Sequence, residues 1–235
     1  MAAGAPSPSD VPGGPDRPER APIEVRRLVL GPIQANGYLV LPEGGRRAVV
    51  IDPGAEPGKV LEALEELGAE PEAILLTHAH LDHLGGVAGV RRRWDVPIHL
   101  HPADRDLYDA AVDQAAAFGL EMDEPPPPDR ELADGQRLDL AGLSFRVRHA
   151  PGHSPGGVVF CLPGHAFVGD CVFAGSVGRV DLPGGHGGTL LRSIREKILS
   201  LPDATVLWPG HGPQTTVARE AESNPFLADA SRWSG

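Results

Sequence analysis

Cysteine is scarce in this chain, which contains Cys161 and Cys171 and no third residue of that type. Two cysteines ten residues apart do not form a disulfide framework, so we expect reduced thiols. Long apolar runs are also missing, because no stretch approaches the roughly 18 apolar residues of a membrane helix. The N-terminus lacks the basic start and apolar core of a secretory signal. These absences predict a cytoplasmic protein without membrane contact.

Positive charge is also in the minority. The chain has 21 Lys and Arg residues against 32 Asp and Glu residues, which gives a net charge of −11. Such a balance repels phosphate backbones, and the basic run at residues 91–93 is short and typical of the solvated end of a helix. The sequence therefore predicts no nucleic-acid partner, and nothing in it specifies an oligomeric state.

The chain divides into a tail and one domain. Residues 1–22 are rich in Ala, Pro, Gly, Ser and Asp without an apolar period, and such a segment cannot bury enough surface to offset its ordering entropy. We predict a disordered tail there and one α/β domain over residues 23–235. Apolar patterning predicts strands at residues 25–30, 38–41, 48–51 and 73–76, and helices at 59–67 and 190–201.

The densest group of chemically active side chains is Thr77-His78-Ala79-His80-Leu81-Asp82-His83. It follows a short apolar run, so the cluster lies where a buried strand ends and its side chains can converge on one point. Imidazole nitrogen suits transition metals, and carboxylate oxygen can bind one ion or bridge two. Because four donors this close cannot all face one tetrahedral ion, we expect two ions, with His78 and His80 on the first and Asp82 and His83 on the second.

Three later segments offer further donors where apolar runs end. His153 lies between Pro and Gly residues that favour a turn, whereas the nearby His149 still belongs to a strand and is a supporting or surface group. Asp170 ends the run at residues 166–169 and is a candidate bridging ligand. His211 follows a strand and has glycine on both sides, so it is the candidate that completes the second site.

This order of ligands, His-x-His-x-Asp-His, then His, Asp and His, resembles that of the metallo-β-lactamase superfamily over about residues 28–227. Motifs at residues 31–36, 51–54, 178–185 and 224–227 are similar to those of the short glyoxalase II-like hydrolases, which are hydroxyacylglutathione hydrolase-like. The resemblance implies a four-layer αββα sandwich with two mixed sheets. It also implies the ligand sets, which are His78, His80, His153 and Asp170 for one metal and Asp82, His83, Asp170 and His211 for the other.

The function that this resemblance implies is cleavage of a small-molecule thioester, such as a hydroxyacylglutathione, by a hydroxide that bridges two divalent metals. Zinc is the first choice of metal, and iron or manganese are alternatives. Coordination lowers the pKa of water from about 16 to about 7, and a thiol with a pKa of roughly 8.5 leaves as thiolate without a general acid. Asp82 and Asp170, which hold the ions and offset their charge, are the residues expected to be essential for catalysis.

Two other functions fit the ligand spacing. Persulfide dioxygenases of the same superfamily use one iron at the first site, and their second-site residues can be present without a metal. A non-catalytic, metal-stabilised protein is the third possibility, although structural zinc sites are usually closed and rich in cysteine. The typical glyoxalase II enzyme also has a C-terminal helical domain that contacts glutathione, whereas 24 residues follow His211 here, so we expect tolerance of other thiol carriers.

The sequence also predicts roles for three features around the expected metal centre. Arg179, which the resemblance puts beside the metal loop, is assigned to substrate binding, with an ion pair to Asp181 as the alternative. Cys171 is expected to be a small buried hydrophobe and not a ligand, because it is adjacent to Asp170 at a strand end. The segment at residues 104–130 is expected either to cover the mouth of the site or to be a surface excursion.

Overall fold

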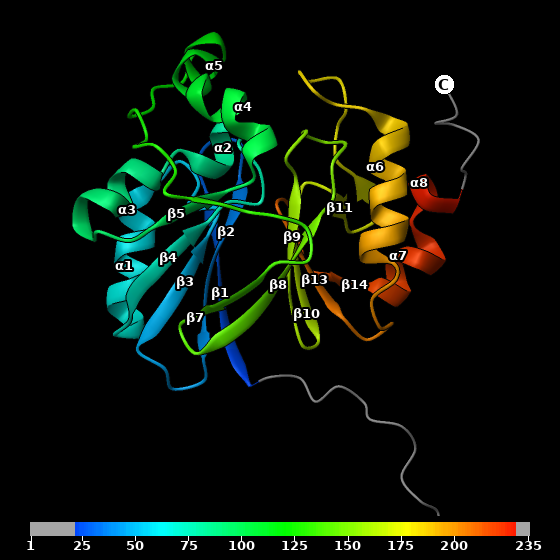
Figure 1. The fold of residues 1–235 in the computed structure, drawn as a ribbon, viewed down its shortest axis with the longest axis horizontal. Coiled ribbons are helices and arrows are strands. Elements are labelled where there is room, and N and C mark those ends of the chain that lie inside the picture. The colour runs from blue at the N-terminus through cyan, green and yellow to red at the C-terminus, as the bar shows by residue number, and fades with distance from the viewer. Residues whose placement is uncertain (1–21, 229–235) are drawn as a thin grey trace, which may run out of the picture.

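Two mixed sheets pack face to face in this computed structural model, with helices on both outer sides (Figure 1). The structure describes residues 22–228, so the tail predicted for residues 1–22 lies, apart from Pro22, outside the described residues. The arrangement confirms the α/β class and the αββα sandwich. Within the described range, no helix is long and apolar enough to cross a membrane.

The first sheet has six strands in the order β1-β2-β3-β4-β5-β6. Strands β1 and β3 are both antiparallel to β2, and β3 to β6 run parallel. Its strands are β1 (Ile23–Leu30), β2 (Ala35–Pro42), β3 (Arg47–Ile51), β4 (Glu70–Leu75), β5 (Ile98–Leu100) and β6 (Arg130–Glu131). The four predicted strands correspond to β1 to β4, with ends that differ by up to three residues.

The second sheet also has six strands, in the order β14-β13-β10-β9-β8-β7. Strands β10 and β13 are parallel, and the other neighbours are antiparallel. Its strands are β7 (Arg137–Leu140), β8 (Leu143–His149), β9 (Val158–Leu162), β10 (His165–Gly169), β13 (Val206–Pro209) and β14 (Thr215–Thr216). A small hairpin of β11 (Val172–Phe173) and β12 (Ser176–Val177) follows β10 directly.

The core between the sheets follows from the two-residue period of the strands. In β8, Leu143, Phe145 and Val147 are buried, while Ser144 and Arg146 between them are exposed. The buried side chains pack in one cluster with residues of β2 and β3, such as Val40 and Ile51. Side chains of alternating strand positions thus join the two sheets across their inner faces.

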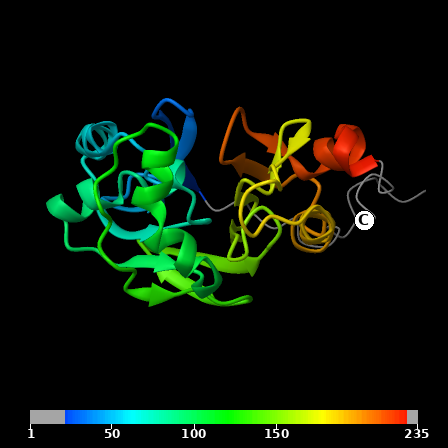
Figure 2. The same cartoon turned by 90° about the horizontal axis from the view of Figure 1, so that it is seen from above.

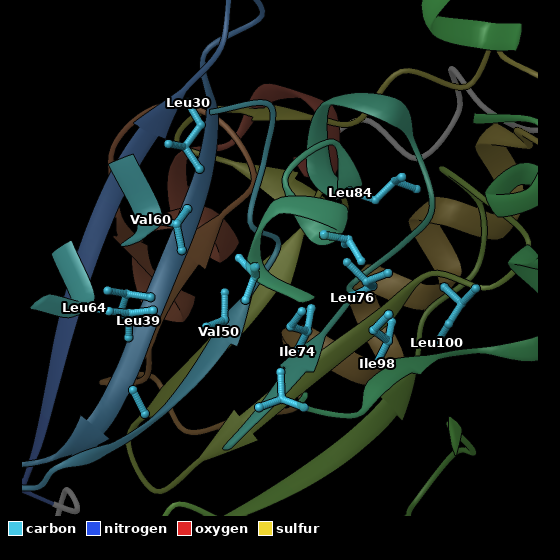
Figure 3. Close-up of a cluster of buried hydrophobic side chains, with 14 of the residues drawn as sticks. Leu30, Leu39, Val50, Val60, Leu64, Ile74, Leu76, Leu84, Ile98 and Leu100 are labelled. Carbon is cyan, nitrogen blue, oxygen red and sulfur yellow. The ribbon is translucent and has the colours of Figure 1, made fainter. Parts of the chain in front are cut away.

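Helices cover both outer faces (Figures 1 and 2). Helices α1 (Pro57–Leu67) and α3 (Val87–Arg93) pack on the first sheet, where Val60 and Leu64 meet Leu39, Val50 and Ile74 (Figure 3). Helix α1 ends at Gly68, whose φ of 59° is the left-handed conformation that glycine adopts without strain. On the second sheet lie α6 (Gly187–Ser193), α7 (Val217–Ser223) and α8 (Pro225–Ala228).

The helix predicted for residues 190–201 begins and ends earlier than expected. It starts at Gly187, because the Nδ1 atom of His186 accepts a hydrogen bond from the amide of Thr189 and caps the first turn. After Ser193 it continues as the π-helical turn η2 (Ile194–Ile198) and then stops. Pro202 lies just beyond, and a residue that precedes proline disfavours the helical conformation.

Short helices stand above one edge of the sandwich, where the strands that carry the site end. They are α2 (Leu81–Leu84), the 3₁₀ turn η1 (Pro102–Asp104), α4 (Arg105–Asp109) and α5 (Ala111–Ala117). The Thr77 carbonyl, just beyond β4, accepts a hydrogen bond from the Val158 amide at the start of β9. This bond joins the chain just beyond β4 to the start of β9, so loops from both sheets meet at one place.

Candidate metal centre

The predicted metal loop begins directly after β4 and ends in α2. His80 is the N-cap residue of that helix, and His78 and His83 are buried beside it, with 2 % and 0 % of their surface exposed. The backbone turns between the end of β4 at Leu75 and the start of α2 at Leu81, so side chains two and three residues apart point inward together. The loop therefore supplies several donors to one small volume, as its spacing predicts.

His78, His80 and His153 form the first triad. The Nδ1 atom of His80 lies 2.8 Å from Nε2 of His153, which lies 3.3 Å from Nε2 of His78. One ring nitrogen of each residue lies within 4.8 Å of the others. His153 reaches this place from the loop between β8 and β9. Three nitrogen atoms that converge so closely have the arrangement that a single metal ion requires.

Asp82, His83 and His211 form the second triad, in which each ligand atom also lies within 4.8 Å of the others. The Nε2 atom of His211 lies 3.2 Å from Oδ2 of Asp82, and Nε2 of His83 lies 3.7 Å from the same oxygen. His211 comes from the loop after β13. One carboxylate and two imidazoles make a donor set that suits zinc, iron or manganese.

Asp170 lies between the triads. Its Oδ1 atom is 3.4 Å from Nε2 of His83, while Oδ2 is 3.5 Å from Nε2 of His153 and 3.5 Å from Nε2 of His211. The carboxylate thus contacts one residue of the first triad and two of the second. The structure brings all of the predicted ligands together, and Asp170 occupies the position expected of a bridge between two ions.

Buried donor atoms without partners support a metal at this place. Among the described residues, Nε2 of His83 and Oδ1 of Asp170 are buried and have no hydrogen-bond partner. Leaving such atoms unsatisfied costs free energy, so their persistence in one cluster calls for another group. A divalent cation accepts electron pairs from both atoms, and the donor set therefore fits a metal ion.

The electrostatics of the cluster also favour a cation. Burial, followed by the nearby imidazoles, lowers the pKa of His78 well below its usual range, and burial with His153 lowers the pKa of His80 to about 4. Both rings are neutral at pH 7 and can bind a metal. The pKa of His83 is instead held well above its usual range. Burial acts to lower it, but the nearby carboxylates of Asp82 and Asp170 outweigh the effect of burial. The carboxylates therefore stabilise positive charge at this position.

Hydrogen bonds at the far side of the rings set which nitrogen faces the cluster. Nδ1 of His153 donates to the carbonyl of Arg179 at 2.8 Å, and Nδ1 of His211 donates to the carbonyl of Gln34 at 3.2 Å. Because Nδ1 carries the proton, Nε2 keeps a free lone pair that points toward the cluster. His80 is oriented the other way, with Nδ1 inward.

Asp52 is a residue of the site that sequence reasoning did not assign. Its carboxylate accepts hydrogen bonds from the Thr77 amide at 2.8 Å, from the Thr77 hydroxyl at 2.5 Å and from Nδ1 of His83 at 3.0 Å. The same hydroxyl lies 3.0 Å from Nδ1 of His78. Asp52 has a φ of 49°, which is uncommon for a residue other than glycine and is held by these bonds. It lies in the motif at residues 51–54, which carried no role.

Asp104 is a second unassigned residue, and it joins the two ligand loops. Its fully buried carboxylate accepts hydrogen bonds from the Ala79 amide at 3.1 Å, the Ser154 hydroxyl at 2.8 Å and the Gly156 amide at 2.5 Å. Ala79 lies between the first two histidines of the metal loop, and Ser154 follows His153. No local pattern distinguishes Asp104 in the sequence, because its partners are 25 to 52 residues away.

Arg179 borders the cluster, but Asp181 holds its guanidinium. Two hydrogen bonds of 2.7 and 2.8 Å join the side chains, and this pairing lowers the pKa of Asp181 to about 2. The pair is therefore ionised at neutral pH. Its assignment to substrate binding stays a prediction. The established contact of Arg179 with the site is its backbone carbonyl, which orients His153.

The cysteines are free and buried. Cys171 packs in the apolar cluster between the second sheet and α6, and its thiol contacts the Ala150 carbonyl at 3.6 Å. It therefore has the environment of a small hydrophobe, as expected.

The structure also places His149, which the sequence predicts to be a supporting or surface group. That ring stacks on His101 with 4.0 Å between centroids and is not part of either triad.

A cavity of about 860 Å³ opens onto both triads. His80, Asp82, His153, Asp170 and His211 form part of its lining, and the segment from Asp106 to Phe118 forms another part. This part of the predicted segment 104–130 does cover the mouth of the site. Residues 119–130 are not among the lining residues, and they continue over the surface toward β6.

Comparison with known proteins agrees with this geometry. The family model for the metallo-beta-lactamase superfamily matches residues 30–211, and the chain belongs to that superfamily. The probable metallo-hydrolase YqgX of Bacillus subtilis (strain 168) is 41% identical over 206 residues, which cover 86% of this chain and 96% of the relative. The chain is therefore a member of a metallo-hydrolase superfamily, and its described residues include candidate metal-binding His/Asp groups.

Two further relatives bear on substrate and metal. The hydroxyacylglutathione hydrolase GloC of Haemophilus influenzae (strain ATCC 51907 / DSM 11121 / KW20 / Rd) is 39% identical over 190 residues, or 79% of this chain and 90% of the relative. The crystal structure of TTHA1623 in a di-iron-bound form is 49% identical and superposes with a TM-score of 0.80. It covers 86% of this chain and 100% of that one.

Proposed function

We propose that this protein is a binuclear metal-dependent hydrolase that cleaves thioesters. The observation that carries the proposal is the position of Asp170, whose two oxygens face one residue of the first triad and two of the second. The second triad lies beside the first, so a second ion would find its own donors there. The similarity to a hydroxyacylglutathione hydrolase supports a thioester as the substrate.

The residues of the cluster would serve as metal ligands in two sets. His78, His80 and His153 would hold one ion, Asp82, His83 and His211 the other, and Asp170 both. Two divalent ions bound there would supply a Lewis acid for the carbonyl and would lower the pKa of water. The protein orients the donors: Asp52 fixes His78 through Thr77 and fixes His83 directly, and the Arg179 carbonyl fixes His153.

A thioester suits this site because its leaving thiol departs as a thiolate near neutral pH. An amine leaving group needs a proton, and the cavity lining outside the cluster offers Asp106 and Arg179 as its ionisable side chains among the described residues. The guanidinium is already paired with Asp181. We expect activity to fall sharply from a thioester to the matched oxygen ester and again to the amide. Equal rates on thioester and amide would contradict thiolate departure.

Iron remains the alternative metal, since TTHA1623 is known in a di-iron-bound form. With iron in the first site alone, the chemistry of a persulfide dioxygenase would be the second candidate. Purified protein with measured zinc, iron and manganese content should be tested with S-lactoylglutathione and with glutathione persulfide. Hydrolysis without oxygen consumption supports our proposal, whereas oxygen consumption with the persulfide supports the alternative.

The cavity argues against a metal that only stabilises the fold. A closed structural site leaves no path for substrate, whereas five of the cluster residues border a cavity of about 860 Å³. We also propose that the protein acts in the cytoplasm and binds no nucleic acid. The net charge of −11 supports the second point.

A further inference from the structure

The cavity above the metal cluster has apolar sides. Leu107 and Phe118, from α4 and the end of α5, stand with Ile33 on one side, and Phe173, Leu182 and Pro183 stand on the other. In Figure 1, helices α4 and α5 lie at the upper left and β11 lies to the right of β9, and the green and yellow segments are also apart in Figure 2. The substrate would therefore pass between two apolar surfaces to reach the cluster.

Two of these apolar side chains are markedly exposed to water. Among the described residues, four large hydrophobic side chains are markedly exposed, and two of them, Ile33 at 42% and Phe118 at 60%, line this cavity. Exposed apolar groups that gather in a cavity mark a place where an apolar ligand can remove them from water. Folding alone does not explain their position, because neither packs in a core cluster.

The apolar surface begins directly at the predicted ligands. The Phe173 ring lies edge-on to the His211 ring with 5.9 Å between centroids, and Leu81 follows His80 in the chain and also lines the cavity. An apolar chain attached to a carbonyl at the cluster would therefore touch apolar surface from its first carbon atoms.

Polar recognition groups are few around the same cavity. Beyond the cluster, the polar side chains in its lining are Asp106, Gln114 and Arg179. Asp181 pairs with Arg179, and the side-chain amide of Gln114 donates to the Leu107 carbonyl at 3.1 Å. A glutathione arm carries two carboxylates and an ammonium group. The lining offers one cation, which is already paired, so it does not match that arm.

We propose that this site selects thioesters by an apolar acyl chain, which lies between Phe118 and Ile33 on one side and Phe173 and Leu182 on the other. This inference rests on the proposed thioester hydrolysis and adds its substrate class. The acyl group is the arm concerned, because thiol carriers place amide or charged groups within a few bonds of sulfur, whereas an unsubstituted acyl chain is apolar from the carbonyl outward.

Acyl-chain length provides the first test. Metal-loaded protein is assayed with acetyl, butanoyl, hexanoyl and octanoyl thioesters of N-acetylcysteamine, so the thiol arm is constant and uncharged. Burial of one methylene supports at most about a fourfold gain. We expect kcat/KM to rise about twofold or more with each methylene, which amounts to at least about 50-fold from acetyl to octanoyl. A flat series, or a series that declines with length, would overturn the inference.

Substitution at the cavity wall provides the second test. Phe118→Ala should lower the octanoyl-to-acetyl ratio of kcat/KM by about fivefold or more, because it removes part of the apolar surface. The matched control is Val112→Ala, which also trims an exposed apolar side chain of α5 but one that does not border the cavity. The control should keep the wild-type ratio. An equal octanoyl-to-acetyl ratio in both variants would show that Phe118 does not recognise the acyl chain.

Equilibrium binding separates this inference from the proposed reaction. Acetate and octanoate, the carboxylate products, are titrated into metal-loaded protein by calorimetry, with no turnover required. We expect octanoate to bind at least tenfold more tightly than acetate and Phe118→Ala to reduce that difference. If no thioester is hydrolysed, the proposed function fails while this titration still decides the inference. Equal affinities for the two carboxylates would contradict it.

Discussion

The Nε2 atom of His83 lies 3.4 Å from Oδ1 of Asp170, and both atoms are buried without a hydrogen-bond partner among the described residues. The other oxygen of Asp170 faces His153 and His211. One carboxylate therefore connects the two triads, and its two oxygen atoms have different neighbours. This arrangement is the structural basis for expecting two ions, and it makes Asp170 the most informative residue to change.

Replacing Asp170 should affect both metals, whereas replacing Asp82 should affect one. We expect Asp170→Ala to lose most of both ions and more than about 100-fold of the activity, because it removes a donor from each site. Asp82→Ala should keep the ion held by the first triad. Elemental analysis after dialysis, together with turnover, measures both effects. Two retained ions and near-normal turnover in Asp170→Ala would show that this carboxylate is not a bridge.

Asp52→Asn should weaken metal binding although Asp52 belongs to neither triad. The carboxylate accepts hydrogen bonds from Thr77 and His83, and loss of such support typically costs 10–100-fold in metal affinity. Competition with a chelator measures the affinity on protein that circular dichroism shows to be folded. Asp139→Asn is the control, since Asp139 is an exposed residue paired with Arg137. An unchanged affinity in Asp52→Asn would contradict the positioning role.

Asp104→Ala should destabilise the fold. It leaves the Ala79 amide, the Ser154 hydroxyl and the Gly156 amide without their acceptor, and each buried unsatisfied group costs free energy. We expect a loss of about 2–4 kcal/mol in the free energy of unfolding. Urea denaturation of metal-free protein measures it without a contribution from metal binding. Asp109→Ala on neighbouring α4 is exposed and should change stability by less than about 1 kcal/mol. Similar losses in both variants would contradict a specific bracing role.

The two thiols should be unreactive until the protein unfolds. Cys161 and Cys171 are buried, with 8% and 3% of their surface exposed, and burial raises the pKa of Cys161 to about 11. At pH 8 such a thiol is ionised in about one molecule in a thousand, and the thiolate is the reactive form. A chromogenic disulfide reagent should detect both thiols in guanidinium chloride and neither in native protein. Rapid reaction of native protein would contradict this burial.

The local part of the site could be predicted from sequence because its donors are neighbours. Residues 77–83 are continuous, and the apolar run before them predicts the strand that presents them. His153, Asp170 and His211 could be selected because each ends a strand-like run beside residues that favour turns. The resemblance to a superfamily then fixed the layers of the fold, which local patterning alone does not determine.

The supporting residues could not be predicted in the same way. Asp52 and Asp104 each reach a partner 25 residues away, and their contacts exist only after the loops of both sheets meet. The apolar sides of the cavity are equally hidden, since Ile33, Phe118 and Phe173 lie in three separate segments and share no period. Such features depend on tertiary packing, which a local pattern does not encode.

The most direct test of the account is a combined measurement of metal content and thioester turnover on one preparation. Protein freed of metal by chelation is reconstituted with zinc, iron or manganese, and the ions bound per chain are counted while S-lactoylglutathione and octanoyl-N-acetylcysteamine are assayed. We predict two ions per chain and hydrolysis that rises with the second ion, without oxygen consumption. Full activity with one ion per chain, or oxygen consumption with glutathione persulfide and no thioester hydrolysis, would contradict the binuclear hydrolase.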